Sequence, residues 1–185
     1  MIKPAHYEET LAHYSDHLHA IELLRKYRPY LETVPSMRRP AESLITIPLP
    51  LVNVRRESPL GSTIHAPSEM LSLDCDLAFL MCDPEWRVKT DVEIFIFIHR
   101  SGEDFSDLLS RWRKTQIMLS RGYSWDMPLT YQHIFNDGAE RHLPLFVLFE
   151  QTPDRIRRGM KGAQLPFIIE SFEAEAELDV ATAID

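Results

Sequence analysis

The sequence predicts an α+β fold in which two helices pack on a mainly antiparallel sheet, with extended arms beside it. Two long segments repeat apolar residues every three or four positions, as amphipathic helices do. Other segments alternate apolar and polar residues, as strands with one buried face do. Most of the 13 prolines fall between these segments, where they separate elements without breaking them. The predicted order along the chain is α-β-β-β-α-β-β.

The first helix is predicted over Tyr7–Tyr27, because apolar residues recur there at three- and four-residue spacing. Pro29 is expected to end this helix, because proline cannot donate a backbone hydrogen bond. The next residues, 32–41, are polar and contain prolines, which predicts a loop. We interpret its basic pair, Arg38 and Arg39, as solvated.

The segment Leu44–Val54 is predicted to be extended, because its β-branched residues favour a strand. Pro48 and Pro50 remove two backbone donors from it, so we expect it at a sheet edge or as an arm. Residues 57–68 contain prolines and a glycine, which predicts a long loop. We therefore expect a proline-rich loop or arm over residues 32–68.

Two alternating strands are predicted next, over Leu71–Met81 and Val88–His99, with a turn at Asp83–Glu85. On the second strand, Phe95 and Phe97 follow the polar residues that begin the same face. We therefore expect the C-terminal half of this strand to be covered on both sides, by a helix or by another subunit.

The second helix is predicted between Ser101 and Gly122, with a signal at each end. Ser101 together with Asp104 resembles a capping box, which satisfies the first backbone N–H groups of a helix. Gly122 suits the C-terminal cap, where the backbone often needs a positive φ. An apolar stripe between these two ends predicts the face that packs on the sheet.

Two further strands are predicted over Leu129–Phe135 and His142–Phe149. Residues 136–138, Asn-Asp-Gly, are typical of a hairpin turn between such strands. The basic segment Gln151–Gln164 predicts a mobile loop. The apolar patch Leu165–Phe172 then leads into an acidic tail, and we expect it to dock on a partner.

Composition predicts a single α+β domain over residues 1–151, followed by a C-terminal extension, 152–185, with the acidic tail. The formal net charge of -8 argues against sequence-specific DNA binding. The longest apolar run, Ile94–Ile98, is too short to cross a bilayer, and the N-terminus lacks the apolar core of a signal peptide. We therefore expect a soluble intracellular protein, with Cys75 buried and no disulfide framework formed with Cys82.

Carboxylates on and between the predicted strands are candidate Mg²⁺ ligands. They are Asp74, Asp76, Asp83, Glu85, Asp91 and Glu93. A common nuclease pattern requires a lysine two residues after the acid, but Arg87 follows Glu85 and Phe95 follows Glu93. We interpret the carboxylates as the solvent-exposed face of two strands. The sequence also lacks the glycine motifs of phosphate-binding loops, dinucleotide-binding loops and serine-hydrolase elbows.

Eight histidines raise the question of a metal site. His13 and His17 are four residues apart on the first predicted helix, so both could reach one ion. The zincin motif requires a glutamate directly after the first histidine, and Tyr14 stands there instead. His6 and His19 are expected on other faces of the helix. We therefore expect a solvated helix face, with neither a metal nor a cofactor.

The element order over residues 7–151 resembles that of the tail-terminator proteins of long-tailed bacteriophages, which complete the tail at the neck. A leading helix precedes a proline-rich arm, two alternating strands, a helix and a returning strand. The resemblance implies copies of the chain in a ring, usually a hexamer, at the head-proximal end of the tail. It implies contacts with tail tube, sheath or neck proteins, and DNA that passes through without sequence-specific binding. It implies no catalysis, and a place in the virion after assembly in the host cytoplasm.

Subunit contacts in such a ring are expected at prolines and phenylalanines of the arm, the second strand and the C-terminal patch. These residues are Pro48, Pro50, Phe95, Phe97, Phe167 and Phe172. Two alternatives remain open at this point. The first is a metal-dependent enzyme that uses the acidic strand face, and the second is an acidic adaptor or immunity-type protein that binds a basic partner.

Overall fold

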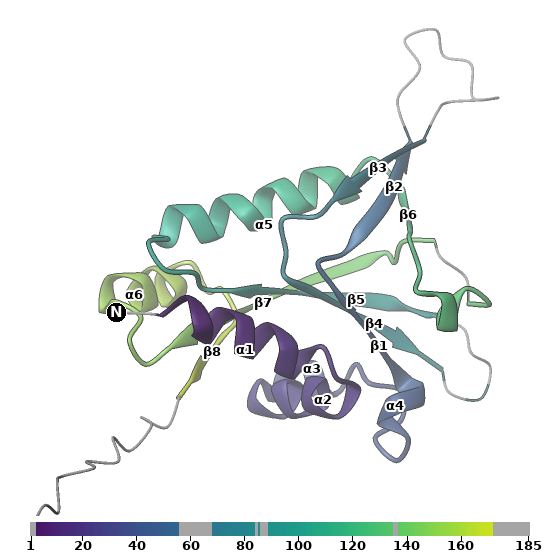
Figure 1. The fold of residues 1–185 in the computed structure, drawn as a ribbon, viewed down its shortest axis with the longest axis horizontal. Helices are drawn as coiled ribbons and strands as arrows, with labels where there is room; N and C mark the ends of the chain where they lie inside the picture. The colour runs from purple at the N-terminus through teal and green to yellow at the C-terminus, as the bar shows by residue number, and fades with distance from the viewer. Residues whose placement is uncertain (1–2, 56–67, 84, 86–88, 135–136, 172–185) are drawn as a thin grey trace, which may run out of the picture.

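A five-stranded main sheet runs through the centre of the fold (Figure 1). The computed structural model describes residues 3–55, 68–83, 85, 89–134 and 137–171. In spatial order, the strands of the main sheet are β1 (Leu44–Pro48), β4 (Leu77–Cys82), β5 (Lys89–Ile98), β7 (Arg141–Phe149) and β8 (Phe167–Glu170). The pairs β1–β4 and β4–β5 are antiparallel, whereas β5–β7 and β7–β8 are parallel.

A separate small sheet of three strands packs over one face of the main sheet. In spatial order, its strands are β3 (Ser68–Ser72), β2 (Leu51–Arg55) and β6 (Tyr123–Trp125). Both of its pairs are antiparallel, so the expected α+β class with mainly antiparallel pairing is confirmed. Val52 lies opposite Leu71 on one side and Trp125 on the other, and these three side chains face the core.

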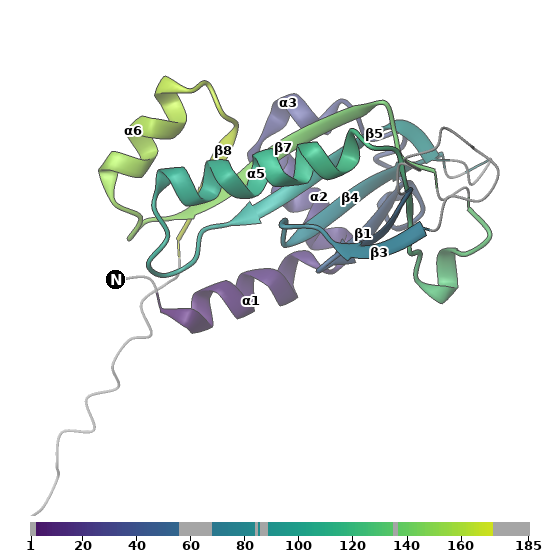
Figure 2. The same cartoon turned by 90° about the horizontal axis from the view of Figure 1, so that it is seen from above.

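Helices lie on both faces of the main sheet (Figures 1 and 2). The face under the small sheet also carries α5 (Phe105–Leu119) and α6 (Asp154–Gly162). The opposite face carries α1 (Pro4–Tyr14), α2 (His17–Lys26) and α3 (Arg28–Leu31). The remaining short helices are α4 (Pro40–Ser43), before β1, and η1 (Leu129–Tyr131), after β6.

The side chains of β5 divide the apolar core into two halves. Phe95 and Phe97 pack with Trp112 of α5, with ring centroids 6.3 and 5.8 Å from that indole. Ile94 and Ile96 point to the other face, into the cluster that contains the buried residues of α2. The prediction that this half of the strand is covered on both sides is therefore confirmed, and helices of the same chain cover it.

The single first helix predicted over residues 7–27 is wrong, because the chain turns between α1 and α2. Asp16 has extended backbone angles, φ -83° and ψ 140°, and its side chain accepts hydrogen bonds from the N–H groups of Leu18 and His19. An N-cap aspartate of this kind starts a new helix, since it satisfies donors that a continuing helix would satisfy with carbonyls. Pro29 lies in the first turn of α3 instead of ending a long helix.

Both long strands predicted before residue 82 are divided between the two sheets. Leu49, with a left-handed φ of 45°, turns the chain between β1 and β2, and its N–H donates to the carbonyl of Asp76. The second corner lies between β3 and β4, where the N–H of Leu73 donates to the carbonyl of Pro50. The two corners are hydrogen-bonded to each other. At the first corner the chain passes from the main sheet to the small sheet, and at the second it returns to the main sheet.

The helix predicted between Ser101 and Gly122 is confirmed as α5, but its cap differs from the prediction. Asp104 is the N-cap, and Asp107 completes the capping box, so Ser101 takes no part in it. The chain after α5 leaves the helix through Gly122, which has a φ of +74°.

The strand predicted over Leu129–Phe135 is wrong, because this segment forms the short helix η1 after Pro128. The hairpin prediction at residues 136–138 is wrong as well: β7 lies parallel to β5, and Asp137 forms an antiparallel bridge with Ser124 of β6. Residues 135 and 136 lie outside the described part of the chain. Apolar Leu129 is 84% exposed, so its hydrophobic character did not indicate burial.

The segment predicted as a mobile loop over residues 151–164 is helix α6, whose Ile156 and Met160 are fully buried. The patch predicted to dock on a partner forms β8, which extends the main sheet beside β7. Residues 154–170 thus belong to the same fold as the residues before 151. The acidic tail lies outside the described residues. Among the described helices, none combines the length and apolar character needed to cross a membrane.

Candidate functional site

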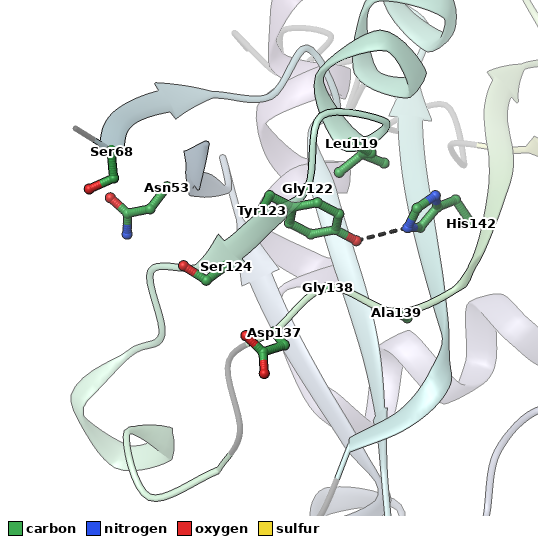
Figure 3. Close-up of a pocket in the computed structure, with 10 residues that line it drawn as sticks. All are labelled: Asn53, Ser68, Leu119, Gly122, Tyr123, Ser124, Asp137, Gly138, Ala139 and His142. Carbon is green, nitrogen blue, oxygen red and sulfur yellow. Dashed lines mark hydrogen bonds between the residues drawn. The ribbon is translucent and has the colours of Figure 1, made fainter. Parts of the chain in front are cut away.

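A polar hollow of about 610 Å³ lies between the small sheet and the start of β7 (Figure 3). The residues that line it are Asn53, Ser68, Leu119, Gly122, Tyr123, Ser124, Asp137, Gly138, Ala139 and His142. Behind this wall lies Glu93 of β5, a carboxylate with no exposed surface. A buried carboxylate beside a hollow is a candidate catalytic or binding group, so its partners decide what it can do.

Glu93 is surrounded by hydrogen-bond donors from two other elements. Its Oε1 accepts from the indole nitrogen of Trp125 at 2.7 Å and from the N–H of Ala139 at 3.2 Å. Its Oε2 accepts from the hydroxyl of Tyr123. These hydrogen bonds compensate the free-energy cost of burying a carboxylate. Without such donors, a carboxylate in the core would strongly destabilise the fold.

The hydroxyl of Tyr123 also lies 2.9 Å from Nε2 of His142, as the dashed line in Figure 3 marks. Because the hydroxyl proton goes to Glu93, the imidazole Nε2 must donate to the hydroxyl oxygen. Burial, together with the charge of Glu93, raises the pKa of Tyr123 above its ordinary value, which keeps the hydroxyl protonated. Gly138 lies against the tyrosine ring, where a Cβ would overlap it.

The chain Glu93–Tyr123–His142 therefore joins β5, β6 and β7 through protein groups. Its hydroxyl is held between a carboxylate and an imidazole, and its carboxylate already accepts from three donors. A general base needs a lone pair that faces the substrate. We interpret this network as the polar link that fixes the small sheet on the main sheet.

A second buried carboxylate, Asp76, lies in the bend before β4. Its oxygens accept from Arg111 and Arg100 at 2.6 Å each, from the N–H of Ile98 at 2.6 Å, and from the hydroxyl of Tyr7 at 3.0 Å. Arg111 lies in α5 and Tyr7 in α1, so this one carboxylate connects the helices on opposite faces of the sheet. Its full set of donors indicates a structural role.

The acidic residues predicted to form one strand face do not form one. Glu93 and Asp76 are buried in separate networks, and Asp74 lies 3.5 Å from Nζ of Lys114. The side chain of Asp91 lies outside the described part. Cys75 is buried as predicted, and burial raises the pKa of its thiol well above the ordinary value, so it is a poor nucleophile.

The residues expected at a subunit interface differ in how they are placed. Phe95 and Phe97 are 0% exposed within the single chain, so a neighbour cannot reach them without opening the core. Pro48 is exposed, whereas Pro50 is buried at the corner between the sheets. Phe167, the first residue of β8, is partly buried against the core. Phe172 lies outside the described residues.

The outer face of the small sheet, whose described side chains carry no charge, was not expected from the sequence. We call it the ribbon face, and its described residues are Leu51, Asn53, Ser68, Met70 and Ser72. Arg55 follows Asn53 in the same row, opposite Ser68, but its side chain lies outside the described part. Met70 is 54% exposed and Leu51 is 36% exposed. The alternation within the segment 68–72 could have indicated this face, since Glu69 and Leu71 point the other way.

Searches of protein-family models, curated proteins and solved structures found no match to this chain. Three features of the described structure bear on function: two carboxylate networks that stabilise the fold, a polar hollow, and the exposed ribbon face. The ribbon face includes exposed apolar side chains, and its strand β3 is hydrogen-bonded on one side only among the described strands.

Proposed function

We propose that this chain is a structural subunit of the tail or neck of a long-tailed bacteriophage. Copies of it assemble into a ring at the head-proximal end of the tail, and the ring performs no catalysis. The observation that carries the proposal is the ribbon face, where Leu51 and Met70 are exposed beside the edge of β3 that pairs with no other described strand. The resemblance to the tail-terminator proteins, drawn from the order of elements predicted from the sequence, points to the same assignment.

The ribbon face has the character of an assembly surface. The chain carries a formal net charge of -8, yet none of the described side chains of the ribbon face is charged. Charged groups are depleted at the centre of protein interfaces. Burial of exposed methionine and leucine side chains against a partner stabilises the complex. An unprotected edge strand also offers unpaired backbone groups to another strand.

The partner that we assign to this face is a second copy of the chain. A ring needs a head-to-tail contact, in which one patch of a subunit meets a different patch of its neighbour. The main sheet supplies a second edge at β8, where Ile169 is 43% exposed. In Figure 1, β8 and the β2–β3 pair lie at opposite ends of the fold, an arrangement that suits head-to-tail contact.

The charge of the chain suits a channel through which DNA moves. A negative surface repels the phosphate backbone, so the DNA would slide without being held. Tail tube, sheath or neck proteins are the partners expected above and below the ring. The hollow beside His142 and the two carboxylate networks are, in this proposal, parts of a rigid subunit rather than an active site.

The proposal is tested by measuring the mass of the purified chain in solution by light scattering, and by imaging the largest species in negative stain. We expect a closed ring of about six subunits with a central hole. A chain that stays monomeric at high concentration, and also fails to form rings when purified tail tubes are added, would overturn the proposal.

A further inference from the structure

Two histidines and a glutamate gather where α1 meets α2. His13 comes from the last turn of α1, whereas His19 and Glu22 come from α2. Each side chain can offer one ligand atom, and the three atoms lie within 4.8 Å of one another. The two imidazole rings are stacked, with centroids 3.8 Å apart and planes inclined by 25°. Two imidazoles packed this closely would repel each other if both were protonated, whereas a shared metal ion would bind both in the neutral form.

The break between the helices creates this group. In one continuous helix, residues six positions apart lie about 120° apart around the axis and about 9 Å apart along it, so His13 and His19 would not meet. The turn at Asp16 redirects the chain and brings their rings together, while His19 and Glu22, three apart, share a face of α2. His17, the expected neighbour of His13, instead lies with its Nε2 2.7 Å from the hydroxyl of Tyr131.

We propose that His13, His19 and Glu22 bind one divalent transition-metal ion of the Zn²⁺ class. Two imidazoles and one carboxylate form a donor set that zinc accepts, with a fourth position open to water or another ligand. Zinc bonds of about 2.0–2.2 Å place tetrahedral ligands roughly 3.4 Å apart, so the three atoms must move inward by about an ångström. His13 and Glu22 are exposed side chains that can rotate to do so.

Residues around the three ligands support binding of a cation. Nδ1 of His19 lies 3.6 Å from Oδ1 of Asp16, a carboxylate that can orient the ring and leave Nε2 for the metal. Lys26, one turn after Glu22, is held 2.7 Å from Glu170 and does not neutralise Glu22. His13 also lines a hollow of about 340 Å³ together with Tyr14, Lys26 and Glu170.

The test is a calorimetric titration of Zn²⁺ into the full chain after a chelator has been used and removed. We expect one ion per chain, and a Tm that rises with Zn²⁺. The variants His13→Ala, His19→Ala and Glu22→Gln should each weaken binding more than about tenfold. His133→Ala is the matched control, because His133 is an exposed histidine outside the group; it should leave the affinity unchanged.

Two further measurements separate a built site from surface binding. Asp16→Asn keeps a good N-cap but removes the charge beside His19, so it should weaken Zn²⁺ binding roughly tenfold and leave the circular dichroism spectrum unchanged. Co²⁺ in place of Zn²⁺ should give the intense visible absorption of a four-coordinate ion. Equal loss of affinity in His133→Ala and His13→Ala, or binding that all variants retain, would overturn the proposal.

Discussion

Trp125 and Glu93 belong to different sheets, yet the indole nitrogen of Trp125 donates a hydrogen bond of 2.7 Å to Oε1 of Glu93. Both residues are buried, with exposed fractions of 1% and 0%. With the hydroxyl of Tyr123 and the N–H of Ala139, this bond ties the small sheet to the main sheet. The position of the ribbon face therefore depends on one buried carboxylate.

Removal of that carboxylate should be costly. Glu93→Ala leaves the donors of Trp125, Tyr123 and Ala139 without their acceptor, and we expect a loss of about 3 kcal/mol or more in the free energy of unfolding. Glu93→Gln keeps the shape and one acceptor oxygen, so it should cost less, about 1–2 kcal/mol. Urea unfolding followed by tryptophan fluorescence measures both. Equal effects of the two variants would contradict a role as acceptor.

The two arginines that contact Asp76 should differ in their contribution to stability. The side chain of Arg111 is 9% exposed and that of Arg100 is 44% exposed, although both lie 2.6 Å from the carboxylate. Arg111→Met should cost about 3–5 kcal/mol, because it leaves a buried charge short of its main partner. Arg100→Met should cost about 1 kcal/mol or less, because water screens that pair. Chemical denaturation of both variants tests the order, and a larger cost for Arg100→Met would reverse the assignment.

Stability should fall as the pH decreases from 7, in part through His99. Burial, and the nearby charge of Arg111, lower the pKa of this histidine in the folded chain, against the opposing effect of Glu103. The neutral ring also fits its contacts, because Nδ1 can accept from Thr152 and Nε2 can donate to the carbonyl of Glu103.

The sign of the effect follows from the protons bound. Below the ordinary histidine pKa of about 6.5, the unfolded chain takes up a proton that folded His99 does not, so the free energy of unfolding decreases until the lowered pKa is reached. His99→Gln should flatten that slope between pH 7 and 5. Denaturant midpoints of the unaltered protein and of His99→Gln, measured across this pH range, test the prediction. If the midpoints of the two proteins fall with pH at the same slope, His99 contributes nothing.

The sequence was sufficient for the fold class, for β5 and for α5, because periodicity and caps are local signals. It was insufficient where a single residue redirects the chain. Asp16 can lie on the surface of a helix or cap a new one, and Leu49 carries no signal for a left-handed turn. The parallel pairing of β5 and β7 depends on α5 crossing between them, which a turn motif at residues 136–138 cannot reveal.

The site was harder to predict than the fold. Glu93 shares a face of β5 with Phe95 and Phe97, and that shared face was the available signal that this glutamate is buried. Its donors come from β6 and from the loop before β7, which tertiary packing alone brings together. The contact between His13 and His19 could not be predicted either, because it depends on the break between α1 and α2 at Asp16.

The central claim, that the chain assembles with itself through the ribbon face, is tested most directly by a matched pair of variants. Met70→Lys places a charge on the ribbon face, and Leu129→Lys places the same charge on a residue exposed elsewhere. Neither should change the free energy of unfolding by more than about 0.5 kcal/mol, because both side chains lie at the surface. Light scattering should then find Met70→Lys monomeric and Leu129→Lys assembled like the unaltered chain. Assembly of Met70→Lys to the same mass would contradict the account.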